Sequence, residues 1–555
     1  MPRVTKVVDA RRLTGPNLDL PGAGAVIEVA LEPSADDGLG ALVTALQAAV
    51  STPISVRQWH DGAALATPGP IDCLYEVVDR LEAVAKAFVD FPATARVPNP
   101  ALLALQAAAA AGGVPFLWDD EQVSVGHGAS TQVFPTGAIP PVDTIDLSGA
   151  RRVPVALVTG TNGKTTTTRM LAKILGAAGH VVGTSSTDAI TVGDALVEAG
   201  DWTGPGAARR VLRDPRVTAA VLESARGGML RRGLAVSDAD VAVVTNVAED
   251  HFGEHGVADL ATMMRTKAVV YGAVRPTAAG GRCVLNADDP TAVAWARANA
   301  IEADPERWIL LTDALVPDTL AHEHLVRGGV VYCIDSHHLT RTTRAATQRI
   351  IGIPTIPASF GGSAHHNVQN ALAAAAMAHA LRVDDTHVSA ALAAFGKHPL
   401  DNPGRAEHYL VGGVHYLFDF SHNPHGVDAI APLVAHLRVP GSRLSVAAGQ
   451  AGDRSDADLT ELAVALMRWA PERVYLRDLR GYERGRADGE VARVMRAAFV
   501  AAGLTDEQIH DVPSELAALE GAYVWARPGD LVVHIVHIER DEVRAWLAAH
   551  EAQPA

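Results

Sequence analysis

The chain has 555 residues, of which 48% are hydrophobic and 20% are charged, and its net charge is −16 at pH 7. This length predicts about three to four domains, and this composition is typical of a folded globular protein. The negative charge argues against nucleic acid as a partner. The sequence lacks an apolar stretch near the membrane-spanning length of about 20 residues, and it lacks a signal-peptide pattern. We therefore expect a cytoplasmic protein without a membrane partner.

Residues 1–133 have the pattern of a small α/β domain. Residues 26–31 alternate like a strand, and residues 38–50 and 78–91 have the apolar spacing of helices. An alanine run at 107–111 is followed by two glycines, which predicts a helix with a glycine C-cap. Residues 134–152 are rich in proline, glycine and isolated polar residues and are interpreted as a linker.

From residue 153 to residue 400, expected strands and helices alternate. The strands are expected at 153–158, 217–222 and 240–246, and the helices at 169–178 and 366–381. This order predicts a central domain with a parallel sheet, helices on both faces, and ligands at the carboxyl ends of the strands. The pattern restarts in a third α/β domain at 401–555, with strands expected at 414–419, 444–448, 473–477 and 531–536.

A glycine loop lies between the first strand and the first helix of the central domain, where residues 159–167 are Thr-Gly-Thr-Asn-Gly-Lys-Thr-Thr-Thr. Gly160 and Gly163 let backbone N–H groups turn toward an anion, and Lys164 can reach the outer phosphates of a nucleotide. Thr165 would hold Mg²⁺. Val158 stands where the general P-loop pattern has its first glycine, so the motif is the shorter form Gly-Thr-Asn-Gly-Lys-Thr.

Two later strands end in candidate metal ligands. Glu223 follows the strand at 217–222, where a carboxylate is well placed to bind Mg²⁺. His251 follows the strand at 240–246. Such a glutamate is usually a surface residue and such a histidine usually has a plain hydrogen-bonding role, but the expected position of both on the rim of the glycine loop favours a metal site.

Five blocks in a fixed order give residues 153–540 a resemblance to the ATP-dependent Mur ligases and folylpolyglutamate synthases. The blocks are Gly160–Thr165, Glu223, Asn246 with Asp250-His251 and His255-Gly256, His366–Asn370, and Pro403–Arg405 followed by Asp419–Pro424. In this family an acid is activated as an acyl phosphate and captured by an amine. The resemblance implies a three-domain architecture: an N-terminal α/β domain, a central P-loop ATPase domain and a C-terminal Rossmann-like domain.

Carried over position by position, the resemblance implies that Lys164 binds the β- and γ-phosphates and that Thr165 and Glu223 hold one Mg²⁺. His251 would help to bind a second Mg²⁺. Lys267 matches a lysine that many members carbamylate, which makes a carboxylate for the second metal; an ordinary helix-surface lysine is the alternative. The expected metal ligands are therefore Thr165, Glu223, His251 and Lys267, and the expected catalytic residues are Lys164, Glu223, His251, Lys267 and Arg405.

The resemblance also implies a set of ATP-binding residues. Asn367 and Asn370 would open a helix at the adenine pocket, while Arg405 and Asp419 would close over phosphate and ribose, with His422 beside them. The full set is Gly160, Thr161, Asn162, Gly163, Lys164, Thr165, Thr166, Asn367, Asn370, Arg405, Asp419 and His422.

Within the family, the chain most resembles the Mur-like half of cyanophycin synthetase. The blocks that carry this resemblance are Gly183–Asp188, Gly200–Pro205, Gly452–Asp458, Asp478–Gly481, and Leu13–Asn17 with Val26–Val29. That enzyme has an ATP-grasp module between its N-terminal domain and its Mur-like part. Here only an opening that resembles the module is present, from Asn99 to Gly128, so we expect a one-step ligase without backbone polymerisation.

The sequence thus predicts an acid–amino-acid ligase that forms an amide bond and releases ADP and phosphate. Asp453, Asp456 and Asp458 could pair with an arginine-like or lysine-like amine, although the same residues are ordinary at a helix start. The acid stays open between aspartate, glutamate, a dipeptide and another small carboxylate, held near Thr184–Asp188 and Arg226.

Two other functions stay open. One is an ATP-dependent ligase that uses ammonia or an unrelated amine, and the other is a non-catalytic ATP-binding regulatory or scaffold subunit. Glu223, His251 and Lys267 argue against a scaffold, which needs no metal sites. The N-terminal region would bind substrate or support a homo-oligomer, either a dimer or a tetramer.

Overall fold

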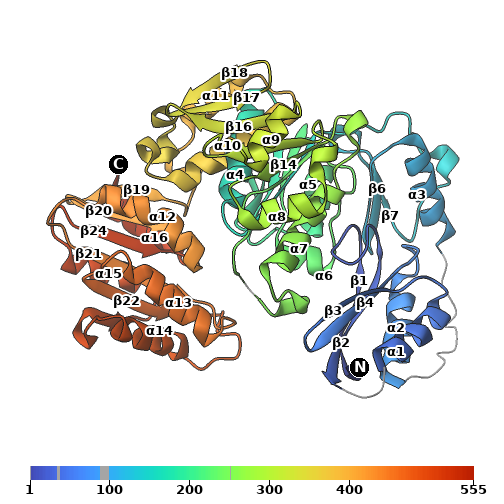
Figure 1. Cartoon of the computed structure of the whole chain (residues 1–555), viewed down its shortest axis with the longest axis horizontal. Helices are drawn as coiled ribbons and strands as arrows, with labels where there is room; N and C mark the ends of the chain where they lie inside the picture. Colours follow the sequence, from blue (N-terminus) through green and yellow to red (C-terminus); the bar gives the residue numbers. More distant parts are fainter. Residues whose placement is uncertain (1, 34–37, 88–98, 251) are drawn as a thin grey trace. The chain divides into compact units, whose positions relative to one another are not determined.

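The computed structural model describes residues 2–33, 38–87, 99–250 and 252–555. The chain forms two compact units. Unit 1 consists of residues 1–350 and 372–391, and unit 2 of residues 351–371 and 392–555. Figure 1 labels the elements of both units. The predicted domain boundaries at 133, 152 and 400 stay predictions.

Unit 1 opens with an antiparallel four-stranded sheet in the order β1-β2-β4-β3. The strands are β1 (Pro2–Leu13), β2 (Gly24–Pro33), β3 (Ser55–Trp59) and β4 (Gly62–Pro68). Helices α1 (Gly38–Val50) and α2 (Leu74–Ala87) cover one face of this sheet, where Leu42 and Leu81 pack with Ile27 and Leu65 (Figure 1). The predicted strand at 26–31 and helix at 38–50 are confirmed, whereas the second helix begins earlier than predicted and residues 88–91 lie outside the described residues.

A smaller sheet follows, made of β5 (Phe116–Trp118), β6 (Gln122–Val125) and β7 (Gln132–Pro135), with helix α3 (Pro100–Gly112) before it. The side chain of Asn99 accepts a hydrogen bond from the Leu102 N–H, and Gly113 ends α3 with a left-handed φ of 62°. The alanine-rich helix with a glycine C-cap is therefore confirmed. The segment interpreted as a linker contains the end of β7 and a short 3-10 turn at Val142–Thr144.

The main sheet of unit 1 has 11 strands in the order β11-β10-β9-β12-β8-β13-β14-β15-β16-β17-β18. The strands from β9 to β16 in this order are parallel, and β10, β11 and β17 are antiparallel. Their bounds are β8 (Val155–Thr159), β9 (Val182–Ser185), β10 (Ala189–Val192), β11 (Ala195–Ala199), β12 (Ala219–Glu223), β13 (Val241–Val244), β14 (Arg282–Asn286), β15 (Trp308–Thr312), β16 (Val330–Asp335), β17 (His338–Thr342) and β18 (Thr347–Gly352). The predicted parallel sheet is confirmed.

Helices lie between these strands along the chain: α4 (Lys164–Ala177), α5 (Pro205–Arg213), α6 (Arg226–Arg231), α7 (Leu260–Gly272), α8 (Pro290–Ala298) and α9 (Leu320–Val326). Helices α10 (His365–Ala380) and α11 (Asp385–Ala394) follow β18. Strand β8 is buried along its whole length, as expected for a strand that is covered on both faces. Helix α4 packs on β8, β9 and β12, and α7 packs on β8 and β13. Strand β8, which leads into the glycine loop, is therefore packed against both α4 and α7.

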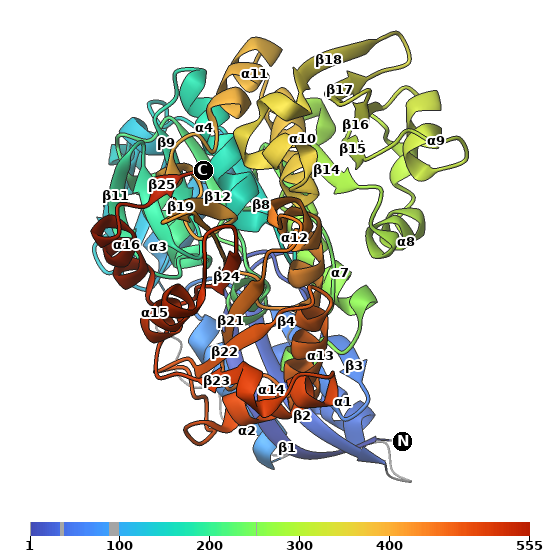
Figure 2. The same ribbon diagram turned by 90° about the vertical axis from the view of Figure 1, so that its left-hand side faces the viewer.

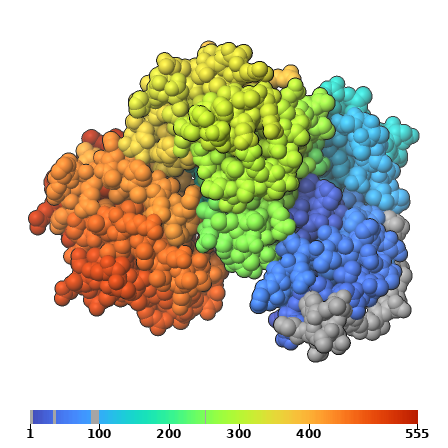
Figure 3. Space-filling view, in the orientation of Figure 1, coloured from blue at the N-terminus to red at the C-terminus, as the bar shows by residue number. Residues whose placement is uncertain are grey.

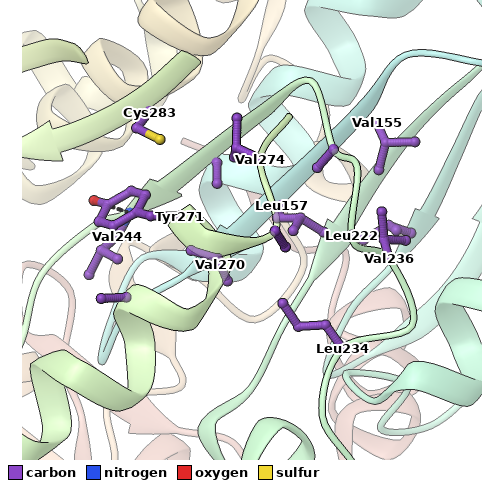
Figure 4. Packing of buried hydrophobic residues seen from close by; sticks show 14 of the residues in the cluster. Val155, Leu157, Leu222, Leu234, Val236, Val244, Val270, Tyr271, Val274 and Cys283 are labelled. Carbon is purple, nitrogen blue, oxygen red and sulfur yellow. Dashed lines mark hydrogen bonds between the residues drawn. The ribbon is translucent and has the colours of Figure 1, made fainter. Parts of the chain in front are cut away.

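Figure 4 shows part of the core beneath α7, where Leu157, Leu222 and Val244 meet Val270 and Tyr271. The Tyr271 hydroxyl donates a hydrogen bond of 2.7 Å to the Val284 carbonyl and accepts one of 3.3 Å from the Val244 N–H. Burial raises the pKa of this tyrosine well above its usual value, so the hydroxyl stays protonated. One side chain of α7 thus joins neighbouring strands β13 and β14.

Unit 2 contains a seven-stranded sheet in the order β23-β22-β21-β24-β20-β19-β25. Its strands are β19 (Glu407–Val411), β20 (Val414–Asp419), β21 (Leu444–Gln450), β22 (Arg473–Asp478), β23 (Ile509–Asp511), β24 (Leu531–Ile535) and β25 (Gln553–Pro554). Strands β20 to β24 are parallel, and β19 is antiparallel to both neighbours. The four strands predicted in this region are confirmed within two residues.

Two groups of helices cover this sheet. Helices α12 (Pro424–Leu437), α13 (Asp456–Met467) and α14 (Glu490–Ala501) pack with one core, and α15 (Glu515–Trp525) and α16 (Arg540–Ala549) pack with another. Figure 2 shows α12 and α13 on one side of β21, β22 and β24 and α15 and α16 on the other. The Rossmann-like α/β fold expected for the third domain is confirmed. Across the described part of the chain, none of the helices combines the length and apolar character needed to span a bilayer.

Replacing Tyr271 by phenylalanine should lower the thermal stability of the protein. The change removes the hydrogen bond from the Tyr271 hydroxyl to the buried Val284 carbonyl, and the loss of one such bond costs about 0.5–1.5 kcal/mol. The measurement is the melting temperature followed by circular dichroism. Tyr75→Phe is the matched control, because Tyr75 is 58% exposed and its hydroxyl bonds Asp120 where water can replace it. Equal melting temperatures for both variants would contradict this account.

Candidate functional site

Strand order brings three chain segments together at the carboxyl edge of the main sheet. Strand β8 lies between β12 and β13, with Val158 in register with Glu223 and Thr159 in register with Val244. The glycine loop therefore leaves the sheet between Glu223 and the segment that follows β13. This is the edge where an open parallel sheet binds its ligands.

Two glycines give the loop its shape. Gly160 has a φ of 153°, and a Cβ atom at this position would lie only 1.8 Å from the Thr245 Oγ1. Gly163 has a φ of 85° and is the N-cap of α4, where no side chain caps the helix. The loop thus delivers an α-helix N-terminus of positive partial charge, the arrangement that binds phosphate groups in proteins.

The segment after β13 holds this loop by several hydrogen bonds. The Thr161 N–H donates to the Asn246 carbonyl at 2.9 Å, and the Asn162 N–H donates to the Asn246 Oδ1 at 3.0 Å. In return, the Asn246 amide and the Thr245 hydroxyl donate to the Asn162 carbonyl at 3.0 and 2.7 Å. Lys164 extends along the same loop, where its Nζ donates to the Thr161 carbonyl at 2.9 Å. The backbone of the glycine loop is therefore fixed by hydrogen bonds within the protein.

Glu223 lies directly beside the start of α4 and is only 2% exposed. Its Oε2 accepts a hydrogen bond of 2.9 Å from the Thr165 hydroxyl, and its Oε1 accepts one of 2.9 Å from the Thr187 hydroxyl. The structure thus brings together Thr165 and Glu223, which were predicted as ligands of one metal ion. Their oxygen atoms are of the hard type that Mg²⁺ prefers.

Lys267, in α7, is 3% exposed, so the interpretation as a helix-surface lysine is wrong. Burial and the neighbouring charge of Lys164 hold the pKa of Lys267 well below its usual value, while Asp250 and Asp289 act in the opposite direction. Burial disfavours the charged form of a lysine and so favours its uncharged, nucleophilic amine. His251, the other predicted ligand of a second metal, lies outside the described residues.

Unit 2 contains the remaining predicted nucleotide-binding residues. Asn367 and Asn370 are buried in the first turns of α10, where the Asn370 amide donates to the Asn367 Oδ1 at 3.3 Å and the Asn367 amide donates to the Ala358 carbonyl at 2.9 Å. The helix predicted to begin there is confirmed at His365–Ala380. The two asparagines are neighbours, as expected.

Arg405, Asp419 and His422 also come together in unit 2. Asp419 ends β20 and accepts a hydrogen bond of 2.8 Å from the Ala406 N–H, next to Arg405. The Arg405 guanidinium lies 4.1 Å from the ring centre of Phe420, and the His422 ring lies 5.4 Å from the same centre. Phe420 is therefore the residue around which the predicted arginine and histidine are arranged.

The three aspartates proposed to bind an amine lie at the start of α13. Ser455 is the N-cap of this helix and forms a capping box with Asp458. Asp456 pairs with Arg486 at 2.7 Å. Two of the three carboxylates therefore have local structural partners, which favours the helix-start interpretation.

Two residues that shape the site were not predicted as metal or nucleotide ligands. Thr187 contributes its hydroxyl to Glu223, and Asp289 caps α8 and accepts a hydrogen bond of 2.5 Å from the Val247 N–H. Asp289 follows the buried strand β14, so the rule that ligands gather at strand ends could have found it. Thr187 lies in a turn between β9 and β10, and the sequence indicated it only as part of the Thr184–Asp188 segment expected near the acid.

The glycine loop, Lys164 and the buried Thr165–Glu223 pair define a P-loop domain, and unit 2 adds a Rossmann-like domain. Residues 158–306 match the Mur ligase middle domain, and residues 404–535 match the Mur ligase glutamate ligase domain. The chain belongs to the Mur ligase family.

Curated relatives include cyanophycin synthetases. The chain is 39% identical over 342 residues to the cyanophycin synthetase of Crocosphaera subtropica. This alignment covers 61% of this chain and 38% of the relative. It is 38% identical over 369 residues to that of Synechocystis sp., covering 66% of this chain and 40% of the relative. The match thus spans well under half of either relative. A UDP-N-acetylmuramyl-tripeptide synthetase of Roseiflexus sp. is 28% identical and is covered to 73%, over 69% of this chain.

Solved structures support the fold. The FolC protein of E. coli in complex with DHPP and ADP has a TM-score of 0.53 at 20% sequence identity, over 72% of this chain and 89% of that chain. The ligand-free bifunctional folylpolyglutamate synthase/dihydrofolate synthase of Yersinia pestis has a TM-score of 0.51 at 19% identity, over 71% of this chain and 90% of that chain. The predicted α/β fold class is confirmed.

Gly160→Ala should lower the melting temperature, because its new methyl group would lie 1.8 Å from the Thr245 Oγ1 and would force the loop away from β13. We expect a loss of about 2 kcal/mol, in the usual range for overpacking at a buried position. Gly176→Ala is the control: it lies in α4 with open space around it, and should be neutral or stabilising by about 0.5–1 kcal/mol. A Gly160→Ala protein as stable as native would show that the loop is not confined by Thr245.

Proposed function

We propose that the chain is an ATP-dependent carboxylate–amine ligase, which forms an amide bond by way of an acyl phosphate and releases ADP and phosphate. The observation that carries this proposal is the contact of 2.9 Å between the Thr165 hydroxyl and the buried Glu223 carboxylate, directly beside Lys164 on the P-loop. A metal-binding oxygen pair next to a phosphate-binding lysine is what phosphoryl transfer from ATP requires.

In this proposal each residue has a definite task. The loop from Gly160 to Thr166 binds the phosphates, Lys164 neutralises their charge, and Thr165 and Glu223 hold one Mg²⁺. Bound Mg²⁺ supplies positive charge to the transferring phosphoryl group. From unit 2, Arg405 would bind phosphate, Asp419 and His422 the ribose side, and Asn367 and Asn370 the adenine. His251 and Lys267 would serve a second Mg²⁺.

Two steps complete the reaction. A carboxylate oxygen of the acid forms a bond to the terminal phosphorus of ATP while the bond from that phosphorus to the ADP oxygen breaks. The amine nitrogen then attacks the acyl carbon, phosphate leaves with its oxygen, and the amine loses a proton to solvent. Lys164 and Arg405 stabilise the negative charge that spreads over the phosphoryl oxygens in the first step.

For substrates, we propose an arginine-like or lysine-like amine and a small amino-acid or dipeptide carboxylate, joined once without polymerisation in the cytoplasm. The identity to proteins named cyanophycin synthetases supports an amino-acid substrate. Thr184–Asp188 and Arg226 would hold the acid, because Thr187 and Arg226 lie on the segments next to Glu223. We further propose that the chain acts as a homo-oligomer.

The decisive experiment is phosphate release from ATP and Mg²⁺ across a matrix of amino acids and dipeptides paired with amines. We expect phosphate only with a particular pair of acid and amine, together with a product mass equal to their sum minus water. Lys164→Ala should reduce the rate by about a hundredfold or more, because it removes charge stabilisation of the transition state. Lys173→Ala, an exposed lysine on the same helix, is the matched control and should keep the native rate.

ATP hydrolysis that needs neither acid nor amine, or no hydrolysis in any pairing despite ATP binding, would contradict the proposed ligase. Equal losses in Lys164→Ala and Lys173→Ala would contradict the task assigned to Lys164.

We also propose that Lys267 is carbamylated. Its uncharged Nζ would attack the carbon of CO₂, forming an N–C bond, and release a proton to solvent, which leaves a carboxylate on the side chain. The burial of Lys267 and its lowered pKa support this reaction, because only the uncharged amine is nucleophilic.

Protein equilibrated with ¹³C-labelled bicarbonate should show a carbamate signal in its ¹³C NMR spectrum, and Lys267→Ala should lose that signal. The activity of Lys267→Ala should fall by about 10- to 100-fold, and acetate should restore part of it by replacing the missing carboxylate. Lys173→Ala should keep both the signal and the activity. An unchanged carbamate signal in Lys267→Ala would place the modification elsewhere, and no signal in the native protein would exclude it.

A further inference from the structure

Two segments leave the sheet edge on either side of the glycine loop. The β12 segment, residues 224–234, follows Glu223 and contains α6; the β13 segment, residues 245–258, contains the position of His251. Both must be fixed in space if Glu223, which directly precedes the β12 segment, and the expected ligand His251 of the β13 segment are to serve one metal site. Figure 3 shows the blue surface of the N-terminal residues beside the green surface of the same unit that includes these segments.

The N-terminal sheet holds the β12 segment by backbone contacts. The Thr14 N–H donates to the Arg232 carbonyl at 2.7 Å, and the Leu234 N–H donates to the Pro16 carbonyl at 2.8 Å. This close approach requires a glycine at position 15, because a Cβ there would lie 2.0 Å from the Leu234 carbonyl oxygen. The end of β1 is thus joined to the chain just beyond α6.

Arg11 of β1 connects the two segments. It is 7% exposed, its Nε donates to the Leu230 carbonyl of α6 at 3.1 Å, and its Nη2 donates to the Glu28 Oε1 at 2.7 Å. Glu28, 4% exposed on β2, in turn contacts the Nδ1 of His255 in the β13 segment, at 3.0 Å through Oε1 and 3.2 Å through Oε2. A continuous chain of buried polar contacts therefore runs from α6 to His255.

The same carboxylate is held in its charged form. Burial by itself would raise the pKa of Glu28, but the hydrogen bond from His255 and the charge of Arg11 hold that pKa at about 2. Asp9, Glu28 and His255 have ligand atoms within 4.8 Å of one another, a spacing that could suit a metal. Here the Arg11 guanidinium pairs with both Asp9 and Glu28, so the positive charge in this cluster comes from the arginine side chain and not from a metal ion.

Strand β3 also contacts the turn at His255 and Gly256. The Arg57 Nη1 donates to the His255 carbonyl at 3.0 Å, and the Arg57 Nε binds the Asp19 carboxylate at 2.6 Å. His255 has a left-handed φ of 51°, and a Cβ on the next residue, Gly256, would lie 2.4 Å from the Trp59 ring. A non-glycine residue keeps such a backbone conformation only when its surroundings enforce it.

We propose that the N-terminal sheet positions the two segments that flank the glycine loop, with Arg11, Glu28 and Arg57 as positioning residues for metal binding. This inference rests on the proposed function, because it assigns a purpose to the Mg²⁺ site. The three residues act through α6 and through His255, whose segment contacts the glycine loop through Asn246. The N-terminal domain then helps to position the metal site, in addition to any role in substrate binding or oligomerisation.

The test is the binding of Mn²⁺, used as a spectroscopic substitute for Mg²⁺, to the full chain in the presence of ADP, followed by electron paramagnetic resonance. Glu28→Gln preserves shape but removes the charge, and should raise the Mn²⁺ dissociation constant by about tenfold, the usual effect of removing a residue that orients a metal site from outside. Arg57→Lys loosens the same turn by a different contact and should shift the constant in the same direction.

Asp119→Asn is the matched control. It also removes a carboxylate that pairs with an arginine in unit 1, but its partners Arg213 and Gln122 lie outside both segments. We expect it to lower the melting temperature without changing the Mn²⁺ constant. If Glu28→Gln and Arg57→Lys lower the melting temperature but leave Mn²⁺ binding unchanged, the contacts are merely structural and the inference is overturned.

The experiment also separates this inference from the proposed function, because it needs neither the acid nor the amine. A native protein that binds no Mn²⁺ with ADP would overturn the proposed function and the inference together. Native binding with unaltered affinity in both variants would overturn the inference alone.

Discussion

The pairing of β8 between β12 and β13 is the constraint on which the candidate site depends. Because the three strands are parallel and in register, Glu223 and the start of the β13 segment lie on either side of the point where the glycine loop begins. No side chain has to reach far: the Thr165 hydroxyl meets Glu223 within the first turn of α4, and Asn246 bonds the loop backbone directly. The positions of the glycine loop and of the Thr165 and Glu223 oxygens follow from that strand order.

Much of this arrangement could be predicted from the sequence, because it depends on local patterns. Apolar runs of four to six residues mark buried strands, and the residue that follows each run lies at the ligand edge. Glu223 and the glycine loop were found in this way, and the structure places Glu223 and Thr165 together as predicted. Burial of Lys267 was not predictable, since helix α7 has apolar residues on several sides and its packing on β8 and β13 decides which of them face inward.

Other features depend on contacts between residues far apart in the chain, which no single-sequence pattern contains. Glu28 and His255 are separated by 227 positions, and nothing near either residue marks it as the partner of the other. Thr187 lies in a turn that strand periodicity does not distinguish from other turns. The aspartates of the third domain show the opposite case: their number suggested a cation site, while the spacing from Ser455 to Asp458 already contained the capping box that the structure shows.

Gly160 and Thr245 illustrate a dependence of a different kind. They follow different strands, β8 and β13, yet the space between them is so small that the residue types at the two positions depend on each other. The Thr245 hydroxyl also donates to the Asn162 carbonyl, so a smaller residue at 245 would free space at 160 only by giving up a hydrogen bond of the loop. Over evolutionary time the two positions are therefore expected to covary, and a lineage that gains a side chain at 160 must first find another donor for the loop carbonyl.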